Sequence, residues 1–370
     1  MKKDTISVKA IEQDDLDFTE CMELYLNYST AGLMYLANEM RKEKVKHGKV
    51  TWIIDRNVNI TNICISRCKF CNFHRKPGDQ GTYITTIDEY KQKINELLRL
   101  GGNQLLLQGG LNPDLGLNYY CDLFQTLKKI YPDLKLHALG PPEIVFLAKK
   151  EKKPYRYILE KLVKAGLDSL PGAGAEILCD VVRKAVSPAK ATSQEWLDVM
   201  YEAHQMGMIT SATMMFGHAE TREDRINHLL KIRDLQKKKP LNAPGFVAFI
   251  PWPFQDENTI LKTRKGIINK VTAEEYIRTI AISRIILNNI NNIQASWLTV
   301  GKETAQVCLH AGANDFGSIM IEENVVSSAG ANYKFNSDGM QKAILEAGFE
   351  PRLRDQGYNF VNLPEHLKTK

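Results

Sequence analysis

Short apolar runs alternate with longer amphipathic stretches along most of this chain. Eight runs bounded by turn residues have the length and composition of buried strands, and they fall at 51–60, 104–108, 135–139, 167–171, 209–217, 245–252, 293–297 and 316–320. Between them, apolar residues recur every three or four positions, which predicts helices at 86–101, 155–166, 193–207, 222–238 and 272–289. Strands that alternate with helices in this way predict parallel βαβ units.

The two ends of the chain differ from this alternating part. Residues 15–47 predict helices with a break and a new N-cap at Ser29, and 327–370 predict a loop, one amphipathic helix and a tail. The sequence Thr-Ala-Glu-Glu at 272–275 predicts a capping box. Because the sequence has neither internal repeats nor a low-complexity linker, we expect one domain, with N-terminal helices at 1–48, a barrel at 49–326 and a C-terminal extension at 327–370.

The strand count favours an α/β fold of the (β/α)8 TIM-type barrel class, since eight strand–helix units in 370 residues fit that architecture. The alternative is an open, doubly wound sheet, but no G-x-G-x-x-G motif follows the first strand. A barrel places its chemistry in the loops after the C-terminal ends of the strands. The stretch "NICISRCKFCNFHR" at 62–75 lies in such a loop, directly after the first predicted strand.

Composition and charge limit the classes of partner. The hydrophobic share of 44% supports a sizeable core, and the net charge of +6 is modest for this length. Lysine-rich stretches at 149–154 and 237–240 lie beside prolines and predict solvated loops, so we expect no nucleic-acid partner. No window approaches the ~20 apolar residues that cross a bilayer, and no apolar segment follows the first lysines as in a signal peptide. We therefore expect a cytoplasmic protein with no membrane partner.

Three cysteines, Cys64, Cys68 and Cys71, stand within eight residues. In a long cytoplasmic chain such a group predicts metal or redox chemistry rather than disulfides. One interpretation is a structural zinc site completed by His74, because three cysteines and a histidine are an ordinary tetrahedral ligand set. The other is a [4Fe–4S] cluster in which three thiolates bind three irons and the fourth iron stays open for chemistry. The C-x3-C-x2-C spacing after a single strand favours the cluster, since zinc ligands usually come from two separated knuckles.

This motif, with Phe70 before its last cysteine, resembles the signature of radical S-adenosylmethionine enzymes. The resemblance implies a [4Fe–4S] cluster whose open iron binds S-adenosylmethionine, and a 5′-deoxyadenosyl radical that abstracts hydrogen from a substrate. Two further stretches are similar to this family, "LLLQGG" at 105–110 and "TMMFGHAE" at 213–220, although Thr213 and Met215 replace the usual glycine and isoleucine. From the resemblance we expect cofactor contacts at Phe70, Gln108, Gly109, Gly110, Glu176, Arg183, Gly217 and Glu220.

Other stretches narrow the resemblance to the futalosine-pathway branch of this superfamily, namely "HALGPPEI", "LPGAGAEIL", "FIPWPFQ" and "SSAGANYK". Aminofutalosine synthase and the deazaflavin synthase subunits are related to this branch and stay as alternatives. Asn112 before Pro113 favours the cyclases of the branch, because the sister enzymes tend to carry histidine there. The resemblance implies that dehypoxanthine futalosine, in menaquinone biosynthesis, loses its ribose C4′ hydrogen and that the carbon radical then closes a ring. It also implies an electron donor such as flavodoxin or ferredoxin.

The implied ring closure needs a base, a carboxylate clamp and anchors for the sugar. Catalytic candidates are His218, Glu143 and His137; His218 follows a strand end, whereas His137 lies in an apolar strand and is equally typical of a core histidine. Arg75 is a candidate for the clamp because guanidinium groups bind carboxylates bidentately, with a surface position as the other interpretation. The other substrate-binding candidates stand near strand ends and are Asn112, Trp252, Gln294, Ser296 and Trp297, where core packing explains the tryptophans equally well.

Overall fold

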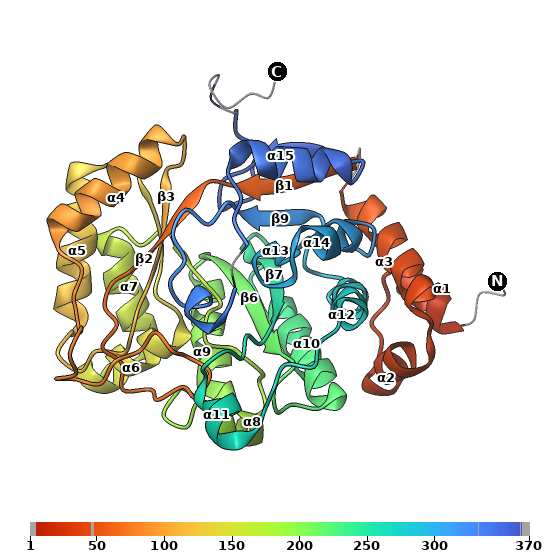
Figure 1. The fold of residues 1–370 in the computed structure, drawn as a ribbon, viewed down its shortest axis with the longest axis horizontal. Coiled ribbons are helices and arrows are strands. Elements are labelled where there is room, and N and C mark those ends of the chain that lie inside the picture. The colour runs from red at the N-terminus through yellow and green to blue at the C-terminus, as the bar shows by residue number, and fades with distance from the viewer. Residues whose placement is uncertain (1–4, 46–47, 332, 363, 365–370) are drawn as a thin grey trace.

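The computed structural model describes residues 5–45, 48–331, 333–362 and 364, and it consists of parallel strands covered by helices (Figure 1). The strands are β1 (Lys49–Ile53), β2 (Asp55–Asn59), β3 (Gln104–Gln108), β4 (Lys135–Ala138), β5 (Ser169–Leu170), β6 (Ile209–Phe216), β7 (Gly245–Pro253), β8 (Asn292–Ile293), β9 (Asp315–Ser318) and β10 (Glu350–Leu353). β1 and β2 form one extended segment that is interrupted only at Ile54. Each of the eight predicted runs therefore contains or overlaps a strand.

The strands close into a barrel. Seven of them pair side by side in chain order from β2 to β8, while β1 pairs with β9 on one side and β10 on the other. A parallel bridge between Gln294, just after β8, and Asp315 in β9 completes the ring. The (β/α)8 prediction is confirmed, and the doubly wound alternative is wrong because the strand order is sequential and returns to its start.

Helices surround the barrel and extend it at both ends (Figure 1). The N-terminal helices are α1 (Thr5–Ile11), α2 (Phe18–Asn27) and α3 (Thr30–Lys44). The helices that follow the barrel strands are α4 (Ile87–Arg99), α5 (Leu117–Ile130), α6 (Pro141–Glu151), α7 (Tyr155–Ala165), α8 (Asp180–Val186), α9 (Ser193–Gln205), α10 (Arg222–Lys237), α11 (Ile260–Lys265), α12 (Ala273–Ile286), α13 (Trp297–Val300) and α14 (Lys302–Leu309). The C-terminal extension contains the short 3-10 helix η2 (Ser327–Ala329) and α15 (Ser337–Glu346).

Helix caps follow the sequence in one case and depart from it in another. Ser29 caps α3 as predicted, since its side chain accepts a hydrogen bond from a backbone N–H of the first turn. At α12 only half of the predicted capping box forms: Thr272 accepts from the backbone of Glu275, but the Glu275 carboxylate accepts hydrogen bonds from Tyr25 and Arg225 instead. A tertiary ion pair has replaced the local contact, and it joins α12 to α2 and α10.

The C-terminal extension contributes a strand that the sequence analysis missed. β10 runs parallel to β1, with Lys49 opposite Glu350 and Trp52 opposite Leu353. Its sequence, Glu-Pro-Arg-Leu, is short and charged, and proline with charge is typical of an edge strand rather than of the buried strands that periodicity detects. Positions 1–4, 46–47, 332, 363 and 365–370 lie outside the described residues, so the division at 1–48, 49–326 and 327–370 stays a prediction.

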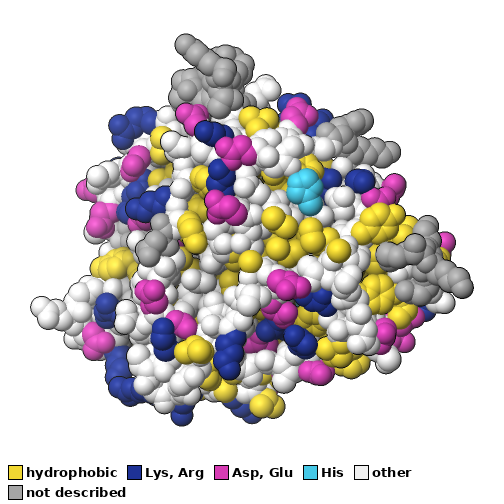
Figure 2. Space-filling model, turned by 45° about the vertical axis from the view of Figure 1, so that its right-hand side comes forward, with side chains coloured by type: hydrophobic (Ala, Val, Ile, Leu, Met, Phe, Trp, Pro, Cys, Tyr) yellow, Lys and Arg dark blue, Asp and Glu magenta, His cyan; other side chains and the backbone are white. Residues whose placement is uncertain are grey.

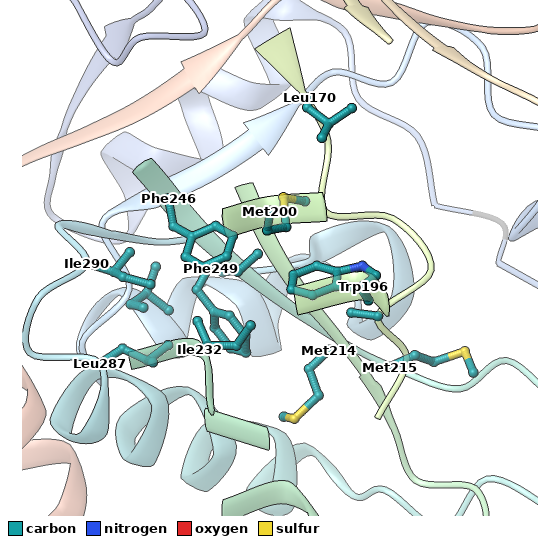
Figure 3. Packing of buried hydrophobic residues seen from close by; sticks show 14 of the residues in the cluster. Leu170, Trp196, Met200, Met214, Met215, Ile232, Phe246, Phe249, Leu287 and Ile290 are labelled. Carbon is teal, nitrogen blue, oxygen red and sulfur yellow. The ribbon is translucent and has the colours of Figure 1, made fainter. Parts of the chain in front are cut away.

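Part of the apolar core lies between β6 and β7 and the helices α9, α10 and α12 (Figure 3). Trp196 of α9 stacks on Phe246 of β7, with ring centroids 6.1 Å apart and ring planes 19° apart. Burial of large apolar side chains such as these stabilises the fold by roughly 1.5–3 kcal/mol each. The indole N–H of Trp196 also donates to the carbonyl of Ala173 at 3.2 Å. This bond holds the loop after β5 against the core.

Charged side chains of both signs are interspersed over the face of the molecule that Figure 2 shows. Apolar side chains gather at the right of that view, between the charged groups. Within the described part of the chain, every helix is too short or too polar to cross a membrane.

Candidate active site

The loop that carries the three cysteines follows β2 and is held in place by backbone hydrogen bonds. The N–H of Cys64 donates to the carbonyl of Arg75 at 2.9 Å, and the N–H of Ile65 donates to the carbonyl of Leu111 at 3.1 Å. Arg67, in the middle of the loop, has a φ of 56°. A non-glycine residue in this left-handed region costs on the order of 1 kcal/mol, so the surrounding contacts must impose the turn.

The Sγ atoms of Cys64 and Cys68 lie within hydrogen-bonding distance of neighbouring groups. The hydroxyl of Ser66 lies 2.9 Å from the Sγ of Cys64 and 3.5 Å from the Sγ of Cys68, and the N–H of Leu111 donates to the Sγ of Cys64 at 3.3 Å. Hydrogen bonds to sulfur are among the means by which proteins tune iron–sulfur clusters. Among the residues that the structure describes, no three His, Cys, Asp or Glu side chains converge on one metal-ion position. A [4Fe–4S] cluster does not require three side chains to converge on one position, because each thiolate binds a different iron.

A glycine pair after β3 makes room for the cysteine loop. A Cβ atom at Gly110 would lie 2.1 Å from the carbonyl oxygen of Ile63 and 2.8 Å from the Cβ of Cys64, far inside the 3.4 Å at which ordinary contact begins. Gly109 is less crowded, since a Cβ there would lie 3.1 Å from the backbone N and O of Thr61. The N–H of Gly110 donates to the carbonyl of Thr61 at 2.8 Å. Position 110 therefore accepts only glycine without moving the cysteine loop.

A buried ion pair stands beside Cys68. The Nζ of Lys190 lies 2.6 Å from the Oε1 of Glu176 and 5.4 Å from the centre of the Phe70 ring, and the two charged side chains are 14% and 6% exposed. Burial works against the charged form of Lys190, but the charges of Cys68 and Glu176 outweigh it and raise the pKa of the amine above its usual value. The wall beside the thiols therefore carries a buried ammonium group that is paired with the Glu176 carboxylate.

Lys190 was not among the site residues predicted from the sequence. It stands 14 residues beyond Glu176, in a stretch with no recognisable motif, and only the fold of the loop after β5 returns it to the thiols.

One cavity of about 410 Å³ joins these groups to the interior of the barrel, a size typical of small-molecule sites. The predicted site residues that line it are Cys64, Cys68, Cys71, Phe70, Gln108, Gly109, Gly110, His137, Glu143, Glu176, Trp252, Gln294, Ser296 and Trp297. Trp297 begins α13 rather than ending the seventh strand, and its indole N–H donates to the carbonyl of Ser318 at 3.1 Å. Residues from at least six separate loops and strands of the barrel thus line the same cavity.

The end of the cavity opposite the cysteines is a buried polar network. Gln104, at the start of β3, donates to the side chain of Gln356 at 3.0 Å, and Gln356 lies 3.4 Å from the Nε2 of His137. The Nδ1 of His137 is 2.7 Å from the hydroxyl of Ser169. Burial lowers the pKa of His137 to about 3, so its ring is neutral near pH 7. His137 is both a buried, hydrogen-bonded histidine and a residue of the cavity wall.

The segment after β10 completes this polar floor. Arg354 binds Asp315 through two hydrogen bonds of 2.6 and 3.1 Å, with side chains 5% and 0% exposed, and its guanidinium lies 3.9 Å from the centre of the Tyr358 ring. Burial opposes the charge on Arg354, but Asp315 outweighs it and raises the pKa of the guanidinium. Asp55 accepts a hydrogen bond from Ser318, and burial raises the pKa of its carboxyl. Arg354 was not among the predicted site residues, because the sequence of its segment predicts only a tail.

Glu143 lies on the cavity wall in the first turn of α6. Burial raises the pKa of its carboxyl to about 7, against backbone hydrogen bonds from Glu143 itself, Gly140 and Gly109 that favour the charged form. A carboxyl with a pKa near neutrality can accept and release a proton at physiological pH. Of the three predicted catalytic residues, Glu143 therefore has the properties of a general base.

His218 lies outside the cavity lining, contrary to the reasoning that a histidine at a strand end reaches the site. Its side chain is 0% exposed, its Nε2 lies 3.0 Å from the carbonyl of Met215, and its Nδ1 accepts from the N–H of Ala219 at 2.7 Å. Glu220 closes the same turn by accepting from the N–H groups of Gly217 and His218 at 2.6 and 2.9 Å. These residues shape the loop after β6, and no catalytic role is proposed for His218.

Three further candidates support the backbone around the site without lining the cavity. Arg183 is buried, and its guanidinium donates to three backbone carbonyls beside the loop after β5. Arg75 is exposed and donates to three carbonyls of the cysteine loop, and its role as a carboxylate clamp stays a prediction. Asn112 is fully buried, its Oδ1 accepts from a backbone N–H two residues on, and its Nδ2 has no partner among the described residues.

Comparisons with known proteins agree with this fold and site. Methylornithine synthase superposes with a TM-score of 0.71 at 18% identity, over 95% of this chain and 98% of that one. HydG, a FeFe-hydrogenase maturase from Carboxydothermus hydrogenoformans, superposes with a TM-score of 0.71 at 14% identity, over 95% of this chain and 80% of that one. Residues 58–232 match the description of the radical SAM superfamily. The barrel with its three-cysteine loop thus defines a radical S-adenosylmethionine enzyme.

The C-terminal part and the most similar relatives narrow the class. Residues 243–367 match the CofH/MqnC C-terminal region. The cyclic dehypoxanthine futalosine synthase of Halalkalibacterium halodurans is 38% identical over 98% of this chain and 95% of its own, and that of Streptomyces coelicolor is 41% identical over 94% and 84%. The 5-amino-6-(D-ribitylamino)uracil–L-tyrosine 4-hydroxyphenyl transferase of Archaeoglobus fulgidus is 39% identical over 88% and 93%. The chain belongs to the CofH/MqnC family of radical SAM enzymes.

Enzymes of this superfamily use a [4Fe–4S] cluster and S-adenosylmethionine, and the residues present fit both. Three thiols border one cavity, and position 110 leaves no room for a side chain between the glycine turn and the thiols. The buried Lys190–Glu176 ion pair lines the same cavity. The zinc alternative needs His74 as a fourth ligand. Its Nδ1 lies 2.8 Å from the carbonyl of Cys71, and no group of described residues that includes it converges on one metal-ion position.

Proposed function

We propose that this enzyme converts dehypoxanthine futalosine to its cyclic product in menaquinone biosynthesis. The observation that carries the proposal is one cavity that is lined by the thiols of the cysteine loop, by Glu143 and by buried polar side chains such as His137. The substrate class is taken from relatives that are 38% and 41% identical to this chain over the aligned residues and are named cyclic dehypoxanthine futalosine synthase.

In this proposal Cys64, Cys68 and Cys71 hold the cluster, and the backbone at Gly109 and Gly110 lets the cofactor approach closely. Bound here, the cluster and S-adenosylmethionine would supply the radical chemistry that removes the C4′ hydrogen of the substrate ribose. The chain contributes a cavity that excludes bulk water, and a site in which the hydrogen to be abstracted can be held close to the cofactor.

Ring closure on the benzoate leaves one proton and one electron to be removed before the ring is aromatic again, and the electron passes to a one-electron acceptor, a role that the oxidised form of a flavodoxin or ferredoxin can fill. Glu143 takes the proton, because its carboxyl has a pKa of about 7 and lines the cavity. The neutral His137 and the side chain of Gln356, at the far end, offer hydrogen bonds to the hydroxyl groups of the sugar. Trp252 and Trp297 wall the cavity at the ends of β7 and β8.

A second function is supported by the transferases that use 5-amino-6-(D-ribitylamino)uracil and L-tyrosine, since the one from Archaeoglobus fulgidus shares 39% of its residues with this chain. Overall identity is therefore nearly equal for the two reactions. A substrate panel separates them: anaerobic, reconstituted enzyme is incubated with S-adenosylmethionine, dithionite and either dehypoxanthine futalosine or the uracil with tyrosine. A cyclised product that lacks two hydrogens supports the cyclase, and turnover of the second pair alone would move the enzyme to the transferases.

The remaining partners are proposals of the same kind. The reaction needs a low-potential one-electron donor, for which flavodoxin or ferredoxin is suited, and a cytoplasmic location suits both the oxygen-sensitive cluster and such a donor. Replacing Cys68 with alanine is expected to remove the brown colour and the iron of the anaerobically purified protein, whereas a colourless, zinc-loaded wild type would contradict the proposal.

A further inference from the structure

Three segments that are far apart in the sequence meet at the surface next to the cysteine loop. Lys69, between Cys68 and Cys71, is the point of contact: its N–H donates to the carbonyl of Val186 at 2.8 Å, and its carbonyl accepts from the N–H of Leu261 at 3.0 Å. Residues 67–76, the end of α8 with the turn after it at 184–189, and α11 with its cap at 260–266 are thereby held side by side. Figure 1 shows α8 and α11 together at the lower edge of the molecule.

These three segments, which we call the basic surface, contain only one sign of charge. They carry eight Lys and Arg residues, four in 67–76, one in 184–189 and three in 260–266, and no Asp or Glu. The whole chain has a net charge of +6, so the basic surface alone exceeds the net charge of the molecule.

Several of these charges are free to meet a partner. Arg67, Lys184, Arg264 and Lys265 are exposed, and none makes a side-chain hydrogen bond or ion pair with any residue in the described part of the chain. Other members are already engaged: Lys262 pairs with Asp256 at 2.8 Å, Lys69 donates to a carbonyl of α8, and Arg75 donates to carbonyls of its own loop.

The position and composition of the basic surface indicate its partner. Its first segment contains two of the three cysteines, so a protein seated here would lie against the loop that holds the cluster. Its aromatic residues, Phe70 and Phe73, line the cavity instead of facing the solvent, which does not suit the stacking of nucleic-acid bases. We propose that the basic surface docks a small acidic one-electron carrier protein, which delivers the electron that the proposed function requires.

Complementary charge of this kind acts mainly on association rate and orientation, and salt screens it over about 10 Å at 0.1 M ionic strength.

The test variant is Arg264→Glu with Lys265→Glu, in the last turn of α11. The matched control is Lys129→Glu with Lys164→Glu, which makes the same charge change at exposed positions in the last turns of α5 and α7.

Binding of flavodoxin to each reconstituted protein is measured by calorimetry at 50 mM and 300 mM KCl. Reduction of the cluster is followed by stopped-flow absorbance, once with reduced flavodoxin and once with dithionite. The test variant is expected to bind flavodoxin at least tenfold more weakly at low salt and to be reduced correspondingly more slowly by it, whereas the control is unchanged. Dithionite, which needs no docking, is expected to reduce all three proteins at the same rate.

Equal flavodoxin binding by the test variant and the control overturns the proposal. It is also overturned if the basic surface binds single-stranded DNA or anionic vesicles, but not flavodoxin, in a way that the test variant abolishes. Because dithionite bypasses the carrier, turnover with dithionite reports on the proposed function alone, and the two ideas fail in distinguishable ways.

Discussion

Replacing Gly110 with alanine tests whether the glycine turn fixes the cysteine loop. The new Cβ would lie 2.1 Å from the carbonyl oxygen of Ile63, so the turn and the loop must separate by about 1.3 Å to reach the 3.4 Å of ordinary contact. The blocking atoms are backbone, which cannot rotate away. Overpacking of this kind costs roughly 1–3 kcal/mol, and a displacement of about 1 Å at a reacting group can lower the rate roughly 100-fold.

The assay compares Gly110→Ala with Gly109→Ala, whose Cβ would lie 3.1 Å from Thr61 and needs a shift of only a few tenths of an ångström. We expect Gly110→Ala to bind less iron and sulfide after reconstitution, to unfold at a lower temperature and to form 5′-deoxyadenosine about 100-fold more slowly. Gly109→Ala should keep most of its iron. Full iron content and an unchanged melting temperature in Gly110→Ala would refute the steric reasoning.

Three further predictions follow from the buried charges. If Glu143 is the base, its deprotonated form is required, so the rate of cyclisation should rise with pH up to about 7 and then level off. Glu143→Gln should lower the rate of cyclisation roughly 100-fold or more and remove this rise from the pH–rate profile. Arg354→Met leaves the fully buried Asp315 without its bidentate partner and should lower the free energy of unfolding by about 3–5 kcal/mol in urea titrations, with Arg354→Lys recovering part of the loss. Lys190→Met should destabilise the cluster-free protein by about 3 kcal/mol, and adding Glu176→Gln should restore part of that stability; simple additivity of the two changes would contradict the ion pair.

The barrel strands could be predicted because strands buried on both faces are continuous apolar runs, and all eight runs contain or overlap a strand. β10 could not, because an edge strand with proline and charges has no such signal, and its place was set by pairing with β1, some 300 residues earlier. The capping box at 272–275 was predicted from local sequence, yet Glu275 bonds to Tyr25 and Arg225 instead. The Glu275 carboxylate therefore binds tertiary partners in place of the backbone at the start of its own helix.

The site residues show the same difference between local sequence motifs and contacts made by the fold. Cys64, Cys68 and Cys71 form a local motif, so sequence spacing alone identified them, and the cavity lining agrees. Lys190 and Arg354 belong to no motif and reach the cavity only through the fold of long loops. His218 shows a different limit of the sequence: its position after β6 is as expected, but its ring bonds to its own loop through contacts that the sequence does not display, and its catalytic role stays an untested prediction.

The most direct test of the proposed reaction follows one hydrogen. Anaerobic, reconstituted enzyme is incubated with dithionite, S-adenosylmethionine and dehypoxanthine futalosine carrying deuterium at the ribose C4′ position, and the 5′-deoxyadenosine formed is examined by mass spectrometry. The proposal predicts that the deuterium appears in 5′-deoxyadenosine and that the cyclised product no longer carries it. Unlabelled 5′-deoxyadenosine, with the deuterium retained in the nucleoside, would contradict the proposal that this cavity directs radical cyclisation at C4′.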